Sequence, residues 1–161
     1  MPSSAYDFSF KSVDGDESID LSDFRGKTMV VVNTASHCGF TPQYKGLQTL
    51  HDSHEDLVVV GVPSNDFGGQ EPADNKRIRE FCDKKYGISF PLTEKSQVKG
   101  SNAHPFFKWA RQELGFVSGV PRWNFHKILI DKNGNAVTGY TSLTKPNSKR
   151  FRKKIENLLA L

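Results

Sequence analysis

The sequence predicts an α/β fold in which helices flank a central mixed sheet, with a β-hairpin at the N-terminus. Two continuous apolar runs, residues 29–32 and 57–63, have the character of strands that are covered on both faces. A segment with helical spacing lies between them, so the three elements form a βαβ unit. An Asn133-Gly134 turn then joins two further strands, which adds an antiparallel pair to the sheet.

The first elements follow from alternation and turn residues. Residues 6–27 alternate apolar and polar side chains around an Asp14-Gly15 turn, which predicts the N-terminal hairpin. After the first buried strand, Pro42 suits the first turn of a helix. The helix continues with an apolar face, formed by Tyr44, Leu47 and Leu50. The second buried strand ends at Pro63 and opens into the loop 67–72.

Two helices are predicted in the middle of the chain. The first is capped by Asp74 or Asn75 and ends at Gly87, and Cys82 lies on its apolar stripe. The second runs over 105–115 and stops at Gly115.

The C-terminal part of the chain supplies two strands and a helix. The strands are expected within 125–131 and 136–142, and the helix has one apolar stripe, formed by Phe151, Ile155, Leu158 and Leu159. The order hairpin, βαβ unit, helix, antiparallel pair and helix is a thioredoxin-like arrangement.

Composition limits the class of protein. A chain of 161 residues predicts a single domain over 1–161. No apolar run is long enough to span a bilayer, so integral membrane association is not expected. The net charge of +4 is too small to indicate nucleic-acid binding by itself. Residues 1–17 lack the basic start and apolar middle of a signal peptide, so a cytoplasmic protein is expected.

The position of Cys38 favours a nucleophile. It lies between the end of a strand and the start of a helix, where backbone N–H groups and the helix dipole stabilise an anion. The corresponding turn of a thioredoxin carries C-x-x-C, but here residues 38–41 supply only the first thiol. A general thiol–disulfide oxidoreductase is therefore disfavoured. In a reducing compartment, redox or catalytic use of Cys38 and Cys82 is favoured over a structural disulfide.

Three segments, in the same order, resemble signatures of the glutathione peroxidase family. They are VNTASHCGFTPQY, GVPSNDFGGQEP and RWNFHKILID. The resemblance implies that Cys38 is the peroxidatic residue of a non-selenium enzyme, and that Gln70, Trp123 and Asn124 complete a catalytic tetrad. Cys82, in EFCDKKYG, is similar to the resolving cysteine of the thioredoxin-dependent branch.

The resemblance implies an antioxidant hydroperoxide reductase that acts in the response to oxidative stress. A Cys38 thiolate attacks the peroxide and becomes a sulfenic acid, Cys82 condenses with it to a redox-active disulfide, and thioredoxin reduces the disulfide. Amide and indole N–H donors of the other three residues suit the sulfur anion. No bound cofactor or metal is expected, only an external thiol reductant, thioredoxin or glutathione.

Two departures from the family pattern bear on mechanism and assembly. Many relatives carry a cysteine where this chain has Ser64, which leaves Cys82 as the resolving candidate. The stretch from Trp109 to Pro121 is short where tetrameric members carry an additional loop, so a monomer is expected.

Alternatives remain open at this point. Free cysteine is often core filler, and Cys82 on an apolar stripe suggests burial, so its helix has to unwind locally if it resolves. If Cys82 is only a core residue, the protein is a one-cysteine peroxidase that uses glutathione. A peroxide sensor or redox relay is a further alternative.

Overall fold

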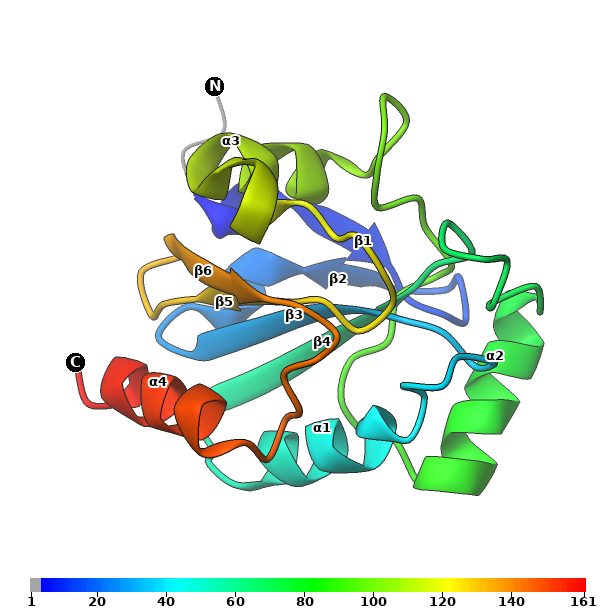
Figure 1. Cartoon of the computed structure of the whole chain (residues 1–161), viewed down its shortest axis with the longest axis horizontal. Helices are drawn as coiled ribbons and strands as arrows, with labels where there is room; N and C mark the ends of the chain where they lie inside the picture. Colours follow the sequence, from blue (N-terminus) through cyan, green and yellow to red (C-terminus); the bar gives the residue numbers. More distant parts are fainter. Residues whose placement is uncertain (1–3) are drawn as a thin grey trace.

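The computed structural model describes residues 4–161 and has a four-stranded mixed sheet at its centre (Figure 1). The strand order is β4-β3-β5-β6. β3 pairs in parallel with β4 and antiparallel with β5, and β5 pairs antiparallel with β6. The strands span Thr28–Thr34 (β3), Leu57–Pro63 (β4), Lys127–Ile130 (β5) and Ala136–Tyr140 (β6). The predicted mixed sheet is therefore confirmed.

The two central strands are covered on both faces, as their continuous apolar sequence predicted. All residues of β3 and β4 are buried. Helix α1 (Gln43–Asp52) connects them, and its inward stripe is formed by Tyr44, Leu47 and Leu50. The βαβ unit thus places the loop between β3 and α1 at the carboxyl end of a central strand.

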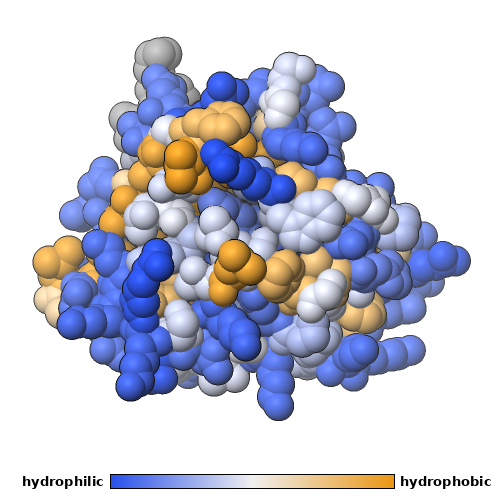
Figure 2. Space-filling model, in the orientation of Figure 1, coloured by the Kyte–Doolittle hydropathy of each residue, from blue (hydrophilic) through white to orange (hydrophobic). Residues whose placement is uncertain are grey.

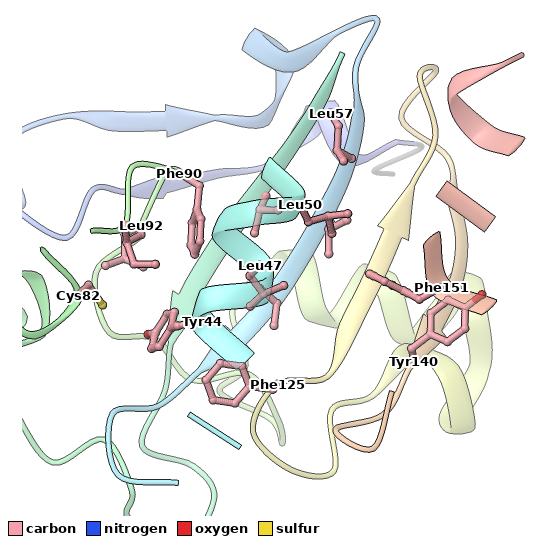
Figure 3. Packing of buried hydrophobic residues seen from close by; sticks show 14 of the residues in the cluster. Tyr44, Leu47, Leu50, Leu57, Cys82, Phe90, Leu92, Phe125, Tyr140 and Phe151 are labelled. Carbon is pink, nitrogen blue, oxygen red and sulfur yellow. The ribbon is translucent and has the colours of Figure 1, made fainter. Parts of the chain in front are cut away.

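One face of the sheet packs against two helices, α1 and α4 (Lys149–Leu159). The segment that contains Cys82 packs against the same face. Figure 3 shows this cluster, with Cys82 and Tyr44 near one end and Phe151 and Tyr140 near the other. Both cysteines of the chain, Cys38 and Cys82, belong to this cluster. The residues that carry the predicted redox chemistry are therefore on one side of the sheet.

The other face of the sheet is covered by α3 (Pro105–Gly119) and the N-terminal segments. The predicted hairpin is present as a separate two-stranded sheet of β1 (Ser9–Lys11) and β2 (Ser18–Asp20). Two short 3₁₀ helices, η1 (Ala5–Asp7) and η2 (Leu21–Phe24), flank it. Aromatic contacts join Phe8 and Phe106 across the cluster, with ring centroids 6.0 Å apart. This layer supports the sheet from the side away from Cys38.

Two predicted helices differ in detail from the structure. The one capped by Asp74 is α-helical over α2 (Asn75–Phe81), then widens into a π-helical turn, η3 (Cys82–Tyr86), before the left-handed Gly87 ends it. α3 bends at Gly115, where the helix was expected to stop, because its φ of 78° is not helical, and one more helical segment follows. Both glycines interrupt regular helix, as glycine does where φ is positive.

The predicted thioredoxin-like fold is confirmed by this arrangement, with its parallel and antiparallel strands and helices on both sides. Within residues 4–161, the structure contains no helix that combines the length and apolar character needed to cross a membrane.

Candidate active site

Cys38 lies in the loop between β3 and α1, as predicted. Its side chain is 8% exposed, and its sulfur accepts a hydrogen bond from the N–H of Phe40 at 3.3 Å. Thr41 closes the loop, because its Oγ1 accepts from the Cys38 N–H at 2.9 Å and donates to the carbonyl of Ala35 at 2.8 Å. A backbone donor thus faces the sulfur in the turn that precedes α1, which suits a nucleophilic thiol.

Gln70, Trp123 and Asn124 are brought together from two distant loops. The Asn124 side chain is fully buried, and its Nδ2 donates to Gln70 Oε1 at 3.0 Å. Trp123 is 37% exposed and packs against Phe67, with ring centroids 5.9 Å apart. Gly68 permits this packing, because a Cβ there would lie 2.9 Å from the indole. The three side chains predicted as donors therefore form one local group.

A backbone hydrogen bond connects this group to the Cys38 loop. The N–H of His37 donates to the carbonyl of Gln70 at 3.0 Å, so Gln70 is tied to the residue that precedes the thiol. In the described part of the chain, none of the three side chains is hydrogen-bonded to the Cys38 sulfur. Their role as donors to that sulfur remains a prediction.

Asn33, which the sequence analysis did not single out, holds Trp123 and Asn124 in place. It is buried near the end of β3, and its Nδ2 donates to the carbonyl of Trp123 at 2.9 Å. Its Oδ1 accepts from the His126 N–H at 3.2 Å, and its carbonyl accepts from the Phe125 N–H at 2.6 Å. Phe125 between them has a φ of 65°, unusual for a residue with a side chain. The sequence signal that could have identified Asn33 is a polar residue inside an otherwise apolar strand.

Cys82 is the first residue of the π-helical turn η3 and is fully buried. Burial raises the pKa of its thiol to about 11, and the Tyr44 hydroxyl beside it opposes part of this shift. Figure 3 shows the sulfur on the side of Cys82 that faces Tyr44. Cys38 and Cys82 are both free thiols. The predicted burial of Cys82 is therefore confirmed.

A buried carboxylate, Glu71, follows Gln70 in the chain. Its Oε2 accepts a hydrogen bond from the Ser36 hydroxyl at 3.0 Å. Burial raises the pKa of Glu71 to about 7, against opposing effects of that hydrogen bond and of the Lys95 charge. A cavity of about 330 Å³ lies beside these residues, lined by Ser36, His37, Pro72, Ala73, Arg77 and Phe81. It separates the Cys38 loop from the helix that leads to Cys82.

Comparison with known proteins gives one consistent family. The family model described as glutathione peroxidase matches residues 5–111. A glutathione peroxidase-like peroxiredoxin of Chlamydomonas reinhardtii is 47% identical over 131 residues, which cover 80% of this chain and 81% of that protein. A hydroperoxy fatty acid reductase of Synechocystis sp. is 45% identical over 151 residues, 88% of this chain and 89% of that protein.

A solved structure of a protein named Trgpx, in its apo form, superimposes with a TM-score of 0.79 at 33% identity, covering 100% of this chain and 98% of the other. The matches to sequence and structure thus extend over the Cys38 loop, the Gln70 loop and the segment of Trp123 and Asn124. The chain belongs to the glutathione peroxidase family and is a peroxidase, as its three signature segments predicted.

Proposed function

We propose that this peroxidase reduces hydroperoxides through Cys38, resolves the product with Cys82, and is recycled by a thioredoxin-type dithiol in the cytoplasm. The observation that carries the proposal is the arrangement at the Cys38 loop. The thiol accepts a backbone hydrogen bond in the turn before α1, and the Gln70–Asn124 pair is tied to the adjacent residue, His37. This combination supplies a nucleophile and neutral N–H donors without a strong base.

The first step is a two-electron reduction of the peroxide. The Cys38 thiolate attacks one peroxide oxygen, the O–O bond breaks, and the departing alkoxide or hydroxide takes a proton to become an alcohol or water. Cys38 is left as a sulfenic acid. Trp123, exposed by 37%, places its indole at the surface of this site, where a substrate can reach it. The role of Gln70, Trp123 and Asn124 in this step is to donate hydrogen bonds to the developing charge.

The second step forms a disulfide between Cys38 and Cys82 and releases water. Thioredoxin-type reduction of this disulfide then regenerates both thiols. The names of the relatives support the choice of reductant and substrate, since several are called peroxiredoxins and one a hydroperoxy fatty acid reductase. Organic and lipid hydroperoxides are therefore included among the proposed substrates, together with hydrogen peroxide.

The burial of Cys82 favours a second candidate. Cys82 is fully buried and its thiol has a pKa of about 11, and both properties are also typical of an unreactive cysteine in a protein core. In that case Cys38 works alone and glutathione is the reductant, as expected of a one-cysteine peroxidase. A relative from Lactococcus lactis, 40% identical over 157 residues, is named glutathione peroxidase without the peroxiredoxin term.

A coupled assay separates the two candidates. NADPH consumption with cumene hydroperoxide is measured with thioredoxin and its reductase, or with glutathione and its reductase, for wild type, Cys38→Ser and Cys82→Ser. We expect turnover with thioredoxin, lost in both variants. Turnover with glutathione that survives Cys82→Ser would instead identify a one-cysteine enzyme. Ser64→Ala, which changes a buried polar residue directly after β4, is the control for general damage to the fold.

A further inference from the structure

Glu71 is a buried charge that the peroxide-reducing step does not use. Its side chain is fully buried, Oε2 accepts from Ser36, and Oε1 has no hydrogen-bond partner among the described residues. Lys95 approaches only the backbone, where its Nζ donates to the carbonyls of Ala73 and Glu71. Burying a carboxylate without an ion pair is costly, so a reason for keeping it is expected.

Glu71 interacts with the segments of both cysteines, through a hydrogen bond on one side and through its charge on the other. Its hydrogen-bond partner Ser36 lies two residues before Cys38, and Glu71 itself follows Gln70. Toward the other thiol, the charge of Glu71 is close enough to raise the pKa of both Cys82 and Tyr44. The carboxylate is therefore in electrostatic contact with the thiol that has to attack Cys38.

The resolving step needs a proton acceptor because a buried thiol with a pKa of about 11 is almost entirely protonated near pH 7. The other ionisable groups around Cys82 are unsuitable. Tyr44 is fully buried and its pKa is raised, so its hydroxyl is protonated. Asp83 lies on the same turn but is about half exposed and paired with Arg79 at 3.2 Å. Glu71 is the remaining candidate.

We propose that Glu71 accepts the proton of Cys82 in the resolving step and returns it to the leaving oxygen. This inference depends on the proposed two-cysteine function. The Cys82 S–H bond breaks toward the carboxylate, and the sulfur electron pair forms the S–S bond with Cys38. The S–O bond of the sulfenic acid breaks, and its hydroxide takes the proton from Glu71 and leaves as water. Cys82 is oxidised, the Cys38 sulfur is reduced, and the carboxylate is regenerated.

The groups that face Glu71 allow it to act near neutral pH. The Ser36 hydroxyl of the Cys38 loop donates to it, and the Lys95 ammonium, from the segment between η3 and α3, acts on it through its charge. Tyr44 of α1 and Cys82 of η3 are close enough for the charge of Glu71 to act on them. Lys95 and Ser36 favour the charged carboxylate, whereas burial disfavours it. A base that is half protonated near the working pH can both take up and release a proton.

The test is a single-turnover experiment on the full-length reduced protein. One equivalent of hydrogen peroxide is added between pH 5.5 and 9, and samples are quenched in acid. Mass spectrometry then measures the Cys38 sulfenic acid, trapped with a diketone, and the Cys38–Cys82 disulfide. The variants are Glu71→Gln, Glu71→Asp as the conservative rescue, and Glu80→Gln as a control, since Glu80 is an exposed glutamate on α2, the helix that leads to Cys82.

We expect Glu71→Gln to form the sulfenic acid at the wild-type rate but the disulfide at least about 100-fold more slowly at pH 7. Its disulfide rate should then rise about tenfold per pH unit, because hydroxide replaces the missing base, while the wild-type rate levels off above about pH 7. Glu71→Asp should recover part of the rate, and Glu80→Gln should behave like wild type.

The failure of this inference is distinct from the failure of the proposed function. Disulfide formation in Glu71→Gln with the wild-type rate and pH profile would overturn the role of Glu71 alone. A wild-type protein that forms the sulfenic acid but never the disulfide would overturn the two-cysteine function, and this inference with it.

Discussion

At the residue scale, Glu71 makes the stability of the protein depend on pH. The pKa of this carboxyl is raised from 4.5 to about 7 by burial, so the folded state binds its proton more tightly than the unfolded state does. The contribution of protonated Glu71 to the stability of the folded state is complete below pH 4.5 and is lost as the pH rises through 7. A shift of this size corresponds to roughly 3 kcal/mol between the two limits.

We therefore expect Glu71→Gln to gain stability relative to wild type as the pH rises. Between pH 4.5 and 8, the difference in free energy of unfolding should change by roughly 3 kcal/mol in favour of the variant. Glutamine keeps an oxygen that can accept from Ser36, so the hydrogen bond is retained. Urea unfolding of the reduced proteins at several pH values measures this difference in the free energy of unfolding. A difference that stays constant with pH would show that the pKa of the Glu71 carboxyl is not perturbed.

At the element scale, the helix that leads to Cys82 changes its type at that residue. The α-helical hydrogen-bond pattern ends at Phe81, and Cys82 begins a π-helical turn that stops at the left-handed Gly87. A π-helical turn is rarer than regular α-helix and often marks a functional site. A disulfide needs the two Cα atoms within about 7 Å. For the proposed reaction of the buried Cys82 with Cys38, we therefore expect this turn to rearrange.

Hydrogen exchange should detect this rearrangement. After oxidation with peroxide, we expect the amides of residues 78–88 to exchange at least about tenfold faster than in the reduced protein, while those of α4 stay unchanged. The Cys82→Ser variant is the matched control, because it cannot close the disulfide and should keep its protection. Equally slow exchange of this segment in reduced and oxidised wild type would contradict local unwinding.

The elements were predictable because their sequence patterns are local. The apolar runs of β3 and β4, the Asp74 cap and the Asn133-Gly134 turn each occupy a few adjacent residues. The change from α-helix to π-helix at Cys82 was not predictable, because the same pattern of apolar residues is compatible with both types of helix. Lys127 is a second example, because a lysine in β5 is fully buried and donates to Gln43 Oε1 at 2.6 Å.

The candidate site was predictable to the extent that its residues lie in recognisable segments. Cys38 followed from its position between strand and helix, but Gln70, Trp123 and Asn124 depended on the family resemblance. Asn33 and Glu71 were missed because their importance comes from burial and from partners far away in the sequence. Such contacts exist only after the loops are packed together.

At the scale of the whole molecule, the surface near α3 combines apolar and positively charged side chains. The exposed large apolar side chains among the described residues are Phe116, Val117, Trp123, Leu143 and Leu161. Figure 2 shows hydrophobic colour over α3, with smaller hydrophobic areas at the centre and left edge of the same face. The Phe116 ring is flanked by the guanidinium groups of Arg111 and Arg122, which lie 5.7 and 4.9 Å from its centroid. The apolar patch around Phe116 is therefore also positively charged.

A two-fold dimer through this patch would bring the same arginines of both copies together, which charge repulsion opposes in a protein of net charge +4. We expect a monomer of 18.1 kDa in light scattering at 50 mM salt. Salt weakens the repulsion, so any association should increase with salt concentration. A mass of about twice this value at 50 mM salt, or one that falls as salt is added, would contradict the argument. In the monomer, the indole of Trp123, which is 37% exposed, stays accessible to solvent.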